Sequence, residues 1–364
     1  MWATAQIVPD TVNAATPSSG VVHDSPAGGM TRGLKKPWVS TPLIESPGLS
    51  EAAGCRIFLK LDNFQPSGSF KSRGVGNYVL QRVRERQDAS CGHLNNKTHF
   101  YASSGGNAGL ACVHAARSLG YPATVVVPTA TKPDLVAMLW AKGAANVIQH
   151  GQSVLEADRY LQETVLKSDP DGVYVPPFDH PDIWDGNSTV MDEIARQMHP
   201  EKPDVVVCSV GGGGLLNGIM QSLDARSWTD DVSVVAMETQ GADSLSQSLK
   251  AGRLITMDKI TSQARSLGVA RVSQRTWEYA QRPRVMSAVL PDDQAAKGSL
   301  LLAQTEKIIA ELTVGVNIAL CFDGLLEKVL GRKVTKSTEV VIVVCGGNDI
   351  NLEMLTEWMK AGHT

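Results

Sequence analysis

Four segments of the sequence combine glycines with residue types that could do chemistry. Residues 205–218 read Val-Val-Val-Cys-Ser-Val-Gly-Gly-Gly-Gly-Leu-Leu-Asn-Gly, so a β-branched strand leads into four consecutive glycines and then an apolar helical pattern. Free N–H groups at the start of a helix bind anions such as phosphate, and glycines let the backbone approach them. No Lys-Ser or Lys-Thr pair follows, which excludes a P-loop. A tight turn is the alternative, but four glycines exceed what a turn needs, so we predict phosphate binding. The glycines are Gly211, Gly212, Gly213 and Gly214.

A lysine stands in the second segment, where a helix is predicted to begin. Residues 65–74 read Gln-Pro-Ser-Gly-Ser-Phe-Lys-Ser-Arg-Gly, which places Lys71 at the helix start and Arg73 two residues later. The positive end of the helix dipole and the charge of Arg73 both favour the neutral amine, the form that Schiff-base chemistry requires. Most lysines are solvated surface residues, and this segment alone does not outweigh that interpretation.

The third and fourth segments also follow predicted strands. Residues 101–109 read Tyr-Ala-Ser-Ser-Gly-Gly-Asn-Ala-Gly and offer hydroxyls, an amide and backbone N–H groups, which suit a carboxylate. A serine that merely caps a helix is the alternative. Residues 344–349 read Val-Cys-Gly-Gly-Asn-Asp, where Cys345 taken alone would be a small buried apolar residue.

The elements that must position these segments alternate between strands and helices. Several β-branched runs are apolar without alternation, as in parallel strands that are buried on both faces. Helical patterns separate them, which predicts an α/β fold with right-handed crossovers. Ligands bind at the carboxyl ends of such strands, where the four segments lie. The predicted strands are Ile57–Leu61, His99–Ser103, Thr124–Val127, Asn146–Gln149, Val205–Val210, Val232–Met237 and Val340–Val344.

Composition narrows the class of protein. The chain has 364 residues, 43% of them apolar and 20% charged, with a net charge of −3. No basic tract is present and the apolar runs are strand-sized, so neither nucleic acid nor a membrane is an expected partner. The six cysteines show no C-x-x-C pair and no zinc spacing, which indicates reduced thiols in the cytoplasm. The first thirty residues lack Lys and Arg, which favours a disordered tail over a transit peptide.

Together the segments resemble the fold-type II pyridoxal-phosphate enzymes, most closely the L-serine/L-threonine dehydratases of the serine-dehydratase branch. The resemblance runs from about Thr41-Pro-Leu43 to the C-terminus. It implies a tryptophan-synthase-β-like fold of two open parallel-type sheets flanked by helices. The matching motifs are Lys60-Leu-Asp62, Pro66-Ser-Gly-Ser-Phe-Lys71, Ser103-Ser-Gly-Gly-Asn-Ala-Gly109, Pro176-Pro-Phe-Asp179, Ile183-Trp-Asp-Gly186, Gly211–Gly214, Met237-Glu-Thr239 and Cys345-Gly-Gly347. The implied domains are a disordered tail (1–34), a large cofactor-binding domain (35–65 and 181–364) and a small domain (66–180).

The resemblance also implies roles at the cofactor, pyridoxal 5′-phosphate. Lys71 would carry it as a Schiff base, Phe70 would pack on one face of its ring, and the four glycines would hold its phosphate. Asn107 would bond its 3′-oxygen, and Cys345 would be a weak neutral partner of the pyridine nitrogen. The expected substrate-binding residues are Ser103, Ser104, Gly105 and Asn107.

A monovalent cation, with potassium as the expected ion, is implied near the phosphate loop. Carboxylate and carbonyl oxygens suit such a hard cation. A salt bridge at the end of a strand is the alternative for the carboxylate. The implied ligands are Gly211, Glu238, Ala242, Leu267 and Val269.

The implied reaction is β-elimination of L-serine, with L-threonine as a further substrate, by a homodimer that binds a small amino acid. Lys71 would remove the α-proton. No histidine or carboxylate in the matching motifs is placed to protonate the leaving hydroxyl, which points to the cofactor phosphate as the donor. The products would be ammonia and pyruvate or 2-oxobutanoate.

Three departures from the family pattern fall near the expected cofactor. They are Glu311-Leu-Thr-Val-Gly315-Val-Asn-Ile-Ala319, Asn348-Asp349 and Ser266. They leave substrate choice open, including a modified β-hydroxy amino acid. β-Replacement, racemisation and cofactor binding without turnover remain as alternative functions.

Overall fold

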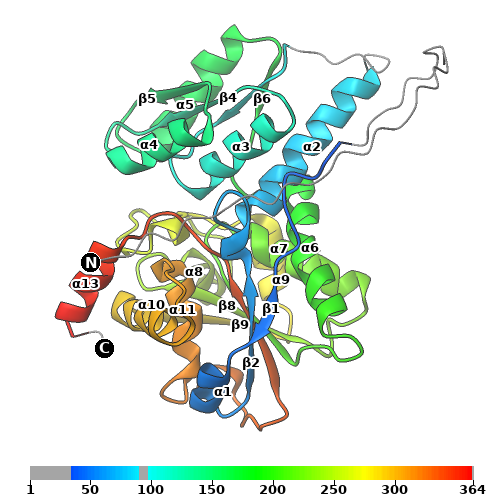
Figure 1. The fold of residues 1–364 in the computed structure, drawn as a ribbon, viewed down its shortest axis with the longest axis vertical. Coiled ribbons are helices and arrows are strands. Elements are labelled where there is room, and N and C mark those ends of the chain that lie inside the picture. Colours follow the sequence, from blue (N-terminus) through cyan, green and yellow to red (C-terminus); the bar gives the residue numbers. More distant parts are fainter. Residues whose placement is uncertain (1–33, 90–96, 363–364) are drawn as a thin grey trace, which may run out of the picture. The chain divides into compact units, whose positions relative to one another are not determined.

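The computed structural model describes residues 34–89 and 97–362. The predicted disordered tail, apart from Leu34, lies outside the described residues, and so does Cys91. Within the described part, the chain forms two separate β-sheets surrounded by helices (Figure 1). The α/β fold class and the two helix-flanked sheets are therefore confirmed.

The larger sheet has six strands in the order β1-β2-β10-β7-β8-β9. All neighbours are parallel except the edge strand β1, which runs antiparallel to β2. The central strands β7, β8 and β10 are buried along their whole length, as their β-branched composition predicts. The bounds are β1 (Leu43–Glu45), β2 (Arg56–Leu61), β7 (Val205–Ser209), β8 (Ser233–Thr239), β9 (Val285–Leu290) and β10 (Glu339–Val344).

The smaller sheet is wholly parallel, with four strands in the order β5-β4-β3-β6. All seven strands predicted from the sequence are present, whereas β1, β6 and β9 were not predicted. The bounds are β3 (His99–Ala102), β4 (Ala123–Val127), β5 (Asn146–Gln149) and β6 (Gly172–Tyr174). The two sheets draw on separate stretches of chain, and the predicted domain boundaries at residues 65 and 181 stay a proposal.

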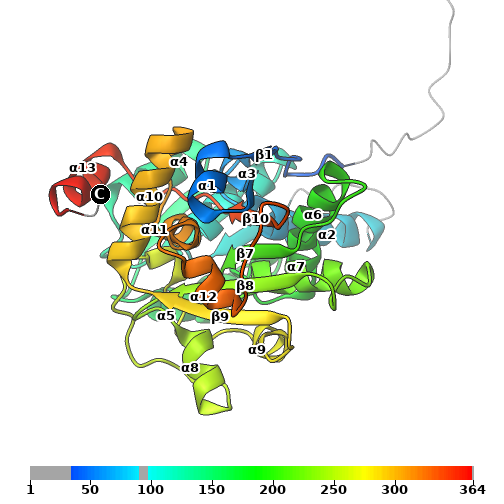
Figure 2. The same cartoon turned by 90° about the horizontal axis from the view of Figure 1, so that it is seen from below.

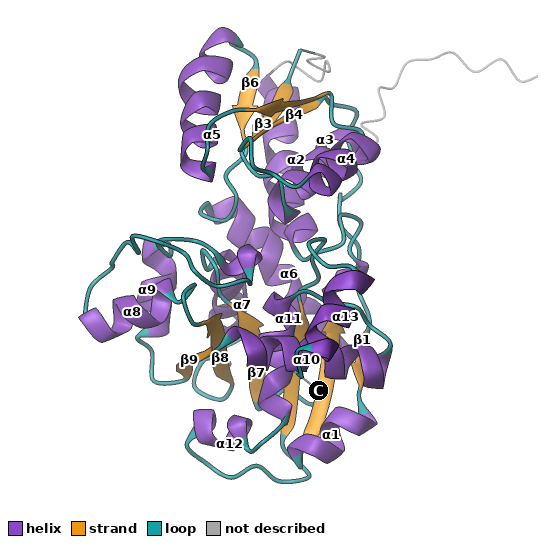
Figure 3. Cartoon of the chain, turned by 90° about the vertical axis from the view of Figure 1, so that its left-hand side faces the viewer, coloured by secondary structure: helices purple, strands orange, loops and turns teal. Residues whose placement is uncertain are grey.

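Helices cover both faces of the larger sheet (Figure 2). Helices α10 and α11 lie on one side of its strands and α6 and α7 on the other, and Figure 3 shows the same elements from another direction. A buried apolar core fills this larger unit, and a second one lies around the smaller sheet. The helices of the larger unit are α1 (Pro47–Ala53), α6 (Pro181–Gln197), α7 (Gly214–Ala225), α8 (Ser244–Ala251), α9 (Gln274–Ala280), α10 (Asp292–Glu306), α11 (Leu312–Ile318), α12 (Leu325–Leu330) and α13 (Leu352–Lys360).

The remaining helices belong to the smaller sheet or lead into it. Helix α2 starts at Lys71, immediately after the segment that follows β2, and packs against both α3 and α6. The bounds are α2 (Lys71–Ala89), α3 (Asn107–Ser118), α4 (Pro133–Lys142) and α5 (Val154–Tyr160). No helix in residues 34–89 or 97–362 is long and apolar enough to cross a membrane.

Candidate active site

The structure brings the four segments singled out in the sequence together. The N–H of Phe70 donates to the carbonyl of Cys345 at 2.9 Å, and the N–H of Gly347 donates to the carbonyl of Gly68 at 3.0 Å. Lys71 therefore starts its helix directly beside the end of β10. The segment after β3 joins them through Asn107, whose amide oxygen accepts from the Asn348 side chain at 2.8 Å.

Lys71 is partly buried, and its amine is turned toward a carbonyl rather than toward a carboxylate. Its Nζ donates to the carbonyl oxygen of Pro177 at 2.6 Å and lies 5.2 Å from the centre of the Phe70 ring. Burial lowers the pKa of Lys71 to about 8, and the nearby Cys345 opposes the shift. The predicted shift toward the neutral amine is thus present, because water is excluded from the ammonium form.

The predicted contribution of Arg73 to that shift is wrong. Its guanidinium is fully buried and lies between the carboxylates of Asp62 and Glu193, at 2.7 Å from each. Two carboxylates compensate its charge, and no effect of Arg73 on the pKa of Lys71 is found. Sequence spacing alone could not reveal these partners, because Glu193 lies 120 residues away.

The glycine loop joins β7 to α7 and carries four free amide groups. None of the backbone N–H groups of Gly211–Gly214 donates a hydrogen bond to any group in the described part of the chain. Only Gly213 has positive φ, at 92°, so a turn requirement does not explain four glycines. At Gly212 a Cβ atom would lie 2.4 Å from the Phe178 ring, so close packing requires a glycine there. The loop has the donors that a phosphate needs.

Phe178 also connects this loop to Lys71. It follows Pro177, which accepts the lysine hydrogen bond, and its ring lies against Gly212. Pro177 and Phe178 belong to the motif Pro176-Pro-Phe-Asp179, whose role the sequence alone did not indicate. The motif follows β6, so its position at the end of a strand was the signal that could have identified it.

The side chain of Asn107 forms hydrogen bonds with residues from all three segments that depart from the family pattern. Its Nδ2 donates to Ser266 Oγ and to Glu311 Oε1, each at 3.2 Å, and its Oδ1 accepts from Asn348. Glu311 is buried, and burial raises its pKa, while bonds from Ser266, the Asp349 N–H and Asn107 offset part of the rise. A carboxyl group therefore lies beside the predicted cofactor residue, which the matching motifs did not indicate.

The predicted substrate-carboxylate loop follows β3 and ends at the start of α3. Ser103 is buried, and its hydroxyl donates to Asp158 Oδ1 at 2.5 Å rather than pointing away from the protein. Tyr174 donates to the same oxygen at 2.8 Å. Ser104 and Gly105 lie at the partly buried tip of the loop. The structure thus gives Ser103 a structural partner, which was not foreseen, and the carboxylate-binding role of this loop stays a prediction.

Cys345 is buried at the end of β10, with its thiol 3.8 Å from Ser209 Oγ. Burial and the charge of Glu311 raise the pKa of Cys345 to about 12. The thiol is therefore neutral at physiological pH, as a weak neutral partner of a pyridine nitrogen would be. Cys55, Cys112, Cys208 and Cys321 are likewise free and buried.

Glu238, the carboxylate of the predicted cation site, is completely buried at the end of β8. It accepts the N–H groups of Leu245 and Ser246 at 2.8 Å each, and burial raises its pKa to about 8. No ion pair involves Glu238 among the residues that the structure describes, so the alternative of a salt bridge is wrong.

The other predicted cation ligands lie in neighbouring segments. The β7–β8 register ends at Ser209 opposite Met237, two residues before Gly211 and one before Glu238, and a Cβ on Gly211 would lie 3.3 Å from Leu267 Cα. The N–H of Val269 donates to the Leu267 carbonyl at 2.7 Å, and the N–H of Ala242 donates to Thr239 at 2.9 Å. No group of three or more His, Cys, Asp or Glu side chains in the described ranges is arranged to hold a metal ion, so a cation site would depend on carbonyl oxygens.

Comparisons with known proteins agree with this geometry. The family model described as "Pyridoxal-phosphate dependent enzyme" matches residues 35–346. A human protein named L-serine dehydratase/L-threonine deaminase is 38% identical over 319 residues, which cover 87% of this chain and 93% of that protein. The catabolic L-serine/threonine dehydratase of Saccharomyces cerevisiae is 39% identical over 330 residues, covering 87% and 89% respectively.

A solved structure extends the similarity to three dimensions. The crystal structure of a fungal L-serine ammonia-lyase from Rhizomucor miehei superimposes with a TM-score of 0.82 at 35% identity. The match covers 90% of this chain and 99% of that one. The similarity in three dimensions therefore extends over most of the chain.

Proposed function

The chain belongs to the family of pyridoxal-phosphate dependent enzymes, and on this premise we propose that it deaminates L-serine, and also L-threonine, by β-elimination. The proposal rests on the closeness of Lys71 to the glycine loop with its four free N–H groups. Lys71 donates to the Pro177 carbonyl, and the ring of the next residue, Phe178, lies against Gly212 of the loop. Relatives at 38% and 39% identity that are named serine and threonine dehydratases support the substrate class.

The residues present fit the proposed cofactor. A phosphate needs several donors, and the free N–H groups of Gly211–Gly214 offer them at the start of a helix. A covalent link to an aldehyde needs a neutral amine, and burial lowers the pKa of Lys71. Cys345 gives the pyridine nitrogen a neutral neighbour. We therefore infer that Lys71, Phe70, Asn107, Cys345 and the glycine loop hold pyridoxal phosphate.

The chemistry is divided between cofactor and protein. When bound, pyridoxal phosphate supplies the electron sink that stabilises negative charge at the substrate Cα. Lys71 Nζ takes the proton from that Cα, because a neutral amine is a competent base. The β-hydroxyl gains one proton as it leaves as water, which balances the proton that Lys71 takes from Cα. Hydrolysis of the remaining enamine then returns one water and gives ammonia with pyruvate from serine, or 2-oxobutanoate from threonine.

Substrate binding falls to the loop after β3. Residues 103–106 precede α3, which begins at Asn107, and the helix dipole favours a carboxylate at this N-terminus. Asp158 accepts a hydrogen bond from the Ser103 hydroxyl and so fixes the start of the loop. We infer that Ser104, Gly105 and Asn107 contact the substrate carboxylate.

We further propose a cytoplasmic homodimer that binds potassium near Glu238. Free, buried cysteines support a reducing compartment. The buried carboxyl group of Glu238, which accepts only backbone N–H groups within the described residues, supports a bound cation that would favour its ionised form. The homodimer rests on the family resemblance.

One incubation separates this activity from the alternatives. The cofactor-loaded enzyme is given L-serine together with a thiol, and pyruvate, D-serine and thioether product are measured in the same sample. We expect pyruvate and ammonia in equal amounts, and none from Lys71→Ala. D-Serine or thioether as the main product would replace the proposal with racemisation or β-replacement.

A further inference from the structure

Helix α6 lies between the helix that begins at Lys71 and the helix that follows the glycine loop. It contacts α2 so closely that a Cβ atom on Gly186 would lie 2.3 Å from the Arg73 carbonyl oxygen and 2.8 Å from Gly74 Cα. The side chain of Asn187, also on α6, donates to the carbonyl of Gly214, the first residue of α7, at 2.9 Å. One helix therefore supports both the lysine and the loop that we assign to the cofactor.

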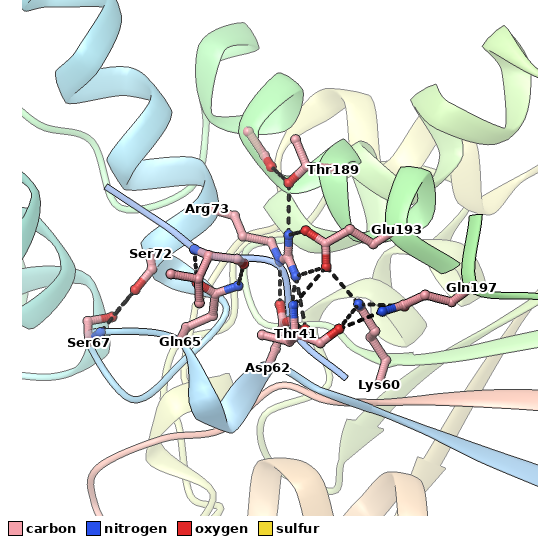
Figure 4. A network of polar contacts seen from close by, with 12 residues as sticks. Thr41, Lys60, Asp62, Gln65, Ser67, Ser72, Arg73, Thr189, Glu193 and Gln197 are labelled. Atoms are coloured by element: carbon pink, nitrogen blue, oxygen red, sulfur yellow. Dashed lines mark hydrogen bonds and ion pairs between the residues drawn. The ribbon is translucent and has the colours of Figure 1, made fainter. Parts of the chain in front are cut away.

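A buried ionic network ties the start of α2 to α6 and β2 (Figure 4). Arg73 donates through Nε and Nη2 to the two Asp62 oxygens, at 2.7 Å each. It donates to the two Glu193 oxygens through Nη1 at 2.7 Å and Nη2 at 2.8 Å. Each carboxylate is held at two points, a geometry that only a guanidinium provides.

The network is balanced in charge and closed to water. Lys60 Nζ adds a bond of 2.6 Å to Glu193, so two cations face two carboxylates. The side chains of Lys60, Asp62 and Arg73 are 0% exposed, and that of Glu193 is 6% exposed. Bonds from Arg73 and Lys60 outweigh burial and lower the pKa of Glu193 to about 2. Glu193 therefore stays ionised over the physiological range.

We propose that Arg73 is the positioning residue for Lys71: its guanidinium, held by Asp62 and Glu193, fixes the first turn of α2 on α6 and so directs the Lys71 amine to the Pro177 carbonyl. The inference rests on the proposed role of Lys71. It assigns a function to two motifs to which the family resemblance gave none. Lys60-Leu-Asp62 supplies two members of the network, and Ile183–Gly186 packs against the start of α2.

Arg73 acts through geometry and not through its own charge. Its positive charge is compensated by two carboxylates, and burial rather than the charge of Arg73 accounts for the lowered pKa of Lys71. A lysine at position 73 keeps the charge but cannot bond both carboxylates at two points each. Arg73→Lys therefore removes the geometry of the guanidinium while it keeps the positive charge.

The test measures the amine of Lys71 itself. The full-length protein, freed of cofactor, is reductively methylated across a pH series, and Lys71 modification is quantified by peptide mass spectrometry. For Arg73→Lys we expect the midpoint of Lys71 modification to rise by about one pH unit, a roughly tenfold loss of neutral amine, because a loosened turn admits water. In the loaded enzyme, kcat for serine falls roughly tenfold while KM changes less than about twofold.

Arg86→Lys is the matched control, because Arg86 lies on the same helix far from Lys71 and bonds Thr98 and the Asp171 carbonyl. Arg86→Lys should lower the melting temperature without shifting the pH midpoint of Lys71 modification. If Arg73→Lys also leaves midpoint and kcat at wild-type values, the network is merely structural and the proposal fails.

Two further arms keep the outcome interpretable. If Arg73→Lys does not fold, Glu193→Gln removes one carboxylate and should move the midpoint in the same direction; an unchanged midpoint there overturns the proposal. Borohydride treatment of the loaded wild type locates the cofactor lysine. Reduction at a lysine other than Lys71 would show that the proposed function of Lys71 had failed, rather than the role of Arg73.

Discussion

The amine of Lys71 is removed from water but is not paired with an acid. Its hydrogen-bond acceptor is the Pro177 carbonyl, which cannot stabilise an ammonium ion as a carboxylate would. Burial therefore lowers its pKa to about 8 from the ordinary value of 10.5. The lysine loses its proton at a pH at which surface lysines remain charged.

The first prediction concerns the pH dependence of cofactor uptake. The neutral amine forms the covalent link, so the rate at which apo-protein takes up pyridoxal phosphate should rise with pH and level off above about 8. Stopped-flow absorbance in the visible region follows the reaction. A rate that keeps rising to pH values near 10.5, the ordinary lysine value, would contradict the effect of burial.

At this scale, the sequence predicts residues that lie within recognisable motifs and misses those that the fold brings in. Lys71, Asn107 and the glycine loop stand at strand or helix ends, where local pattern is informative. Asp158 and Glu193 lie within helices and show no local signal, because their partners are far apart in sequence. The buried pair of Arg73 with Glu193 could therefore not be predicted from spacing.

The strands of the fold follow from apolar β-branched runs, and the exceptions have a physical reason. The unpredicted β1 and β6 have only three residues each, too few for a pattern. Strand β9 lies at the edge of its sheet and is only partly buried, so its sequence need not be continuously β-branched. The central strands, buried on both faces, were predicted with bounds close to those observed.

The contact between α2 and α6 gives a prediction at the scale of elements. Gly186→Ala places a methyl group 2.3 Å from the Arg73 carbonyl oxygen, so the two helices must separate. We expect the free energy of unfolding in urea to fall by about 1–3 kcal/mol. Pyruvate production should fall too, because Lys71 begins the displaced helix.

Gly48→Ala is the control for this substitution. Gly48 lies in α1, and a Cβ there would have no atom closer than 3.8 Å, from Thr305. Its effect on stability should stay within about 0.5 kcal/mol. Equal stability of the two alanine variants would refute the close contact of α2 with α6.

The second element-scale prediction concerns the end of β8. Glu238 is buried without an ion-pair partner in the described residues, and burial raises its pKa to about 8. A monovalent cation bound to Glu238 and to the Gly211 carbonyl would stabilise the ionised carboxylate and fix the glycine loop. Removal of potassium, or Glu238→Ala, should weaken cofactor retention and lower turnover while the circular dichroism spectrum persists. Sodium should restore less activity than potassium. If cofactor affinity is unchanged in the absence of both potassium and sodium, Glu238 has only a structural role and the prediction is wrong.

At the scale of the molecule, an ion pair connects the units built on the two sheets. Lys132, the residue before α4 beside the smaller sheet, pairs with Asp349, which follows β10 of the larger one. The N–H of Asp349 also donates to Glu311 at 2.9 Å, next to Asn107. The pair therefore links the two units beside the proposed substrate site.

Breaking this pair should weaken substrate binding. Lys132 is 38% exposed, so the pair contributes at most about 1 kcal/mol, and Lys132→Gln should raise KM for serine by about two- to fivefold with kcat retained. Added salt should raise the wild-type KM but not that of the variant, because screening weakens the same pair. Lys202→Gln, which breaks the exposed pair with Asp231, serves as the control. Identical salt dependence in all three proteins would rule out this link.

The covalent attachment of the cofactor to Lys71 is the central claim, and it can be measured directly. The protein is loaded with pyridoxal phosphate, reduced with borohydride, digested and analysed by mass spectrometry. The account predicts a yellow protein whose colour is lost on reduction, with the pyridoxyl-phosphate mass on the peptide that contains Lys71 and none in Lys71→Ala. A colourless protein after loading, or the added mass on a different lysine, would contradict it.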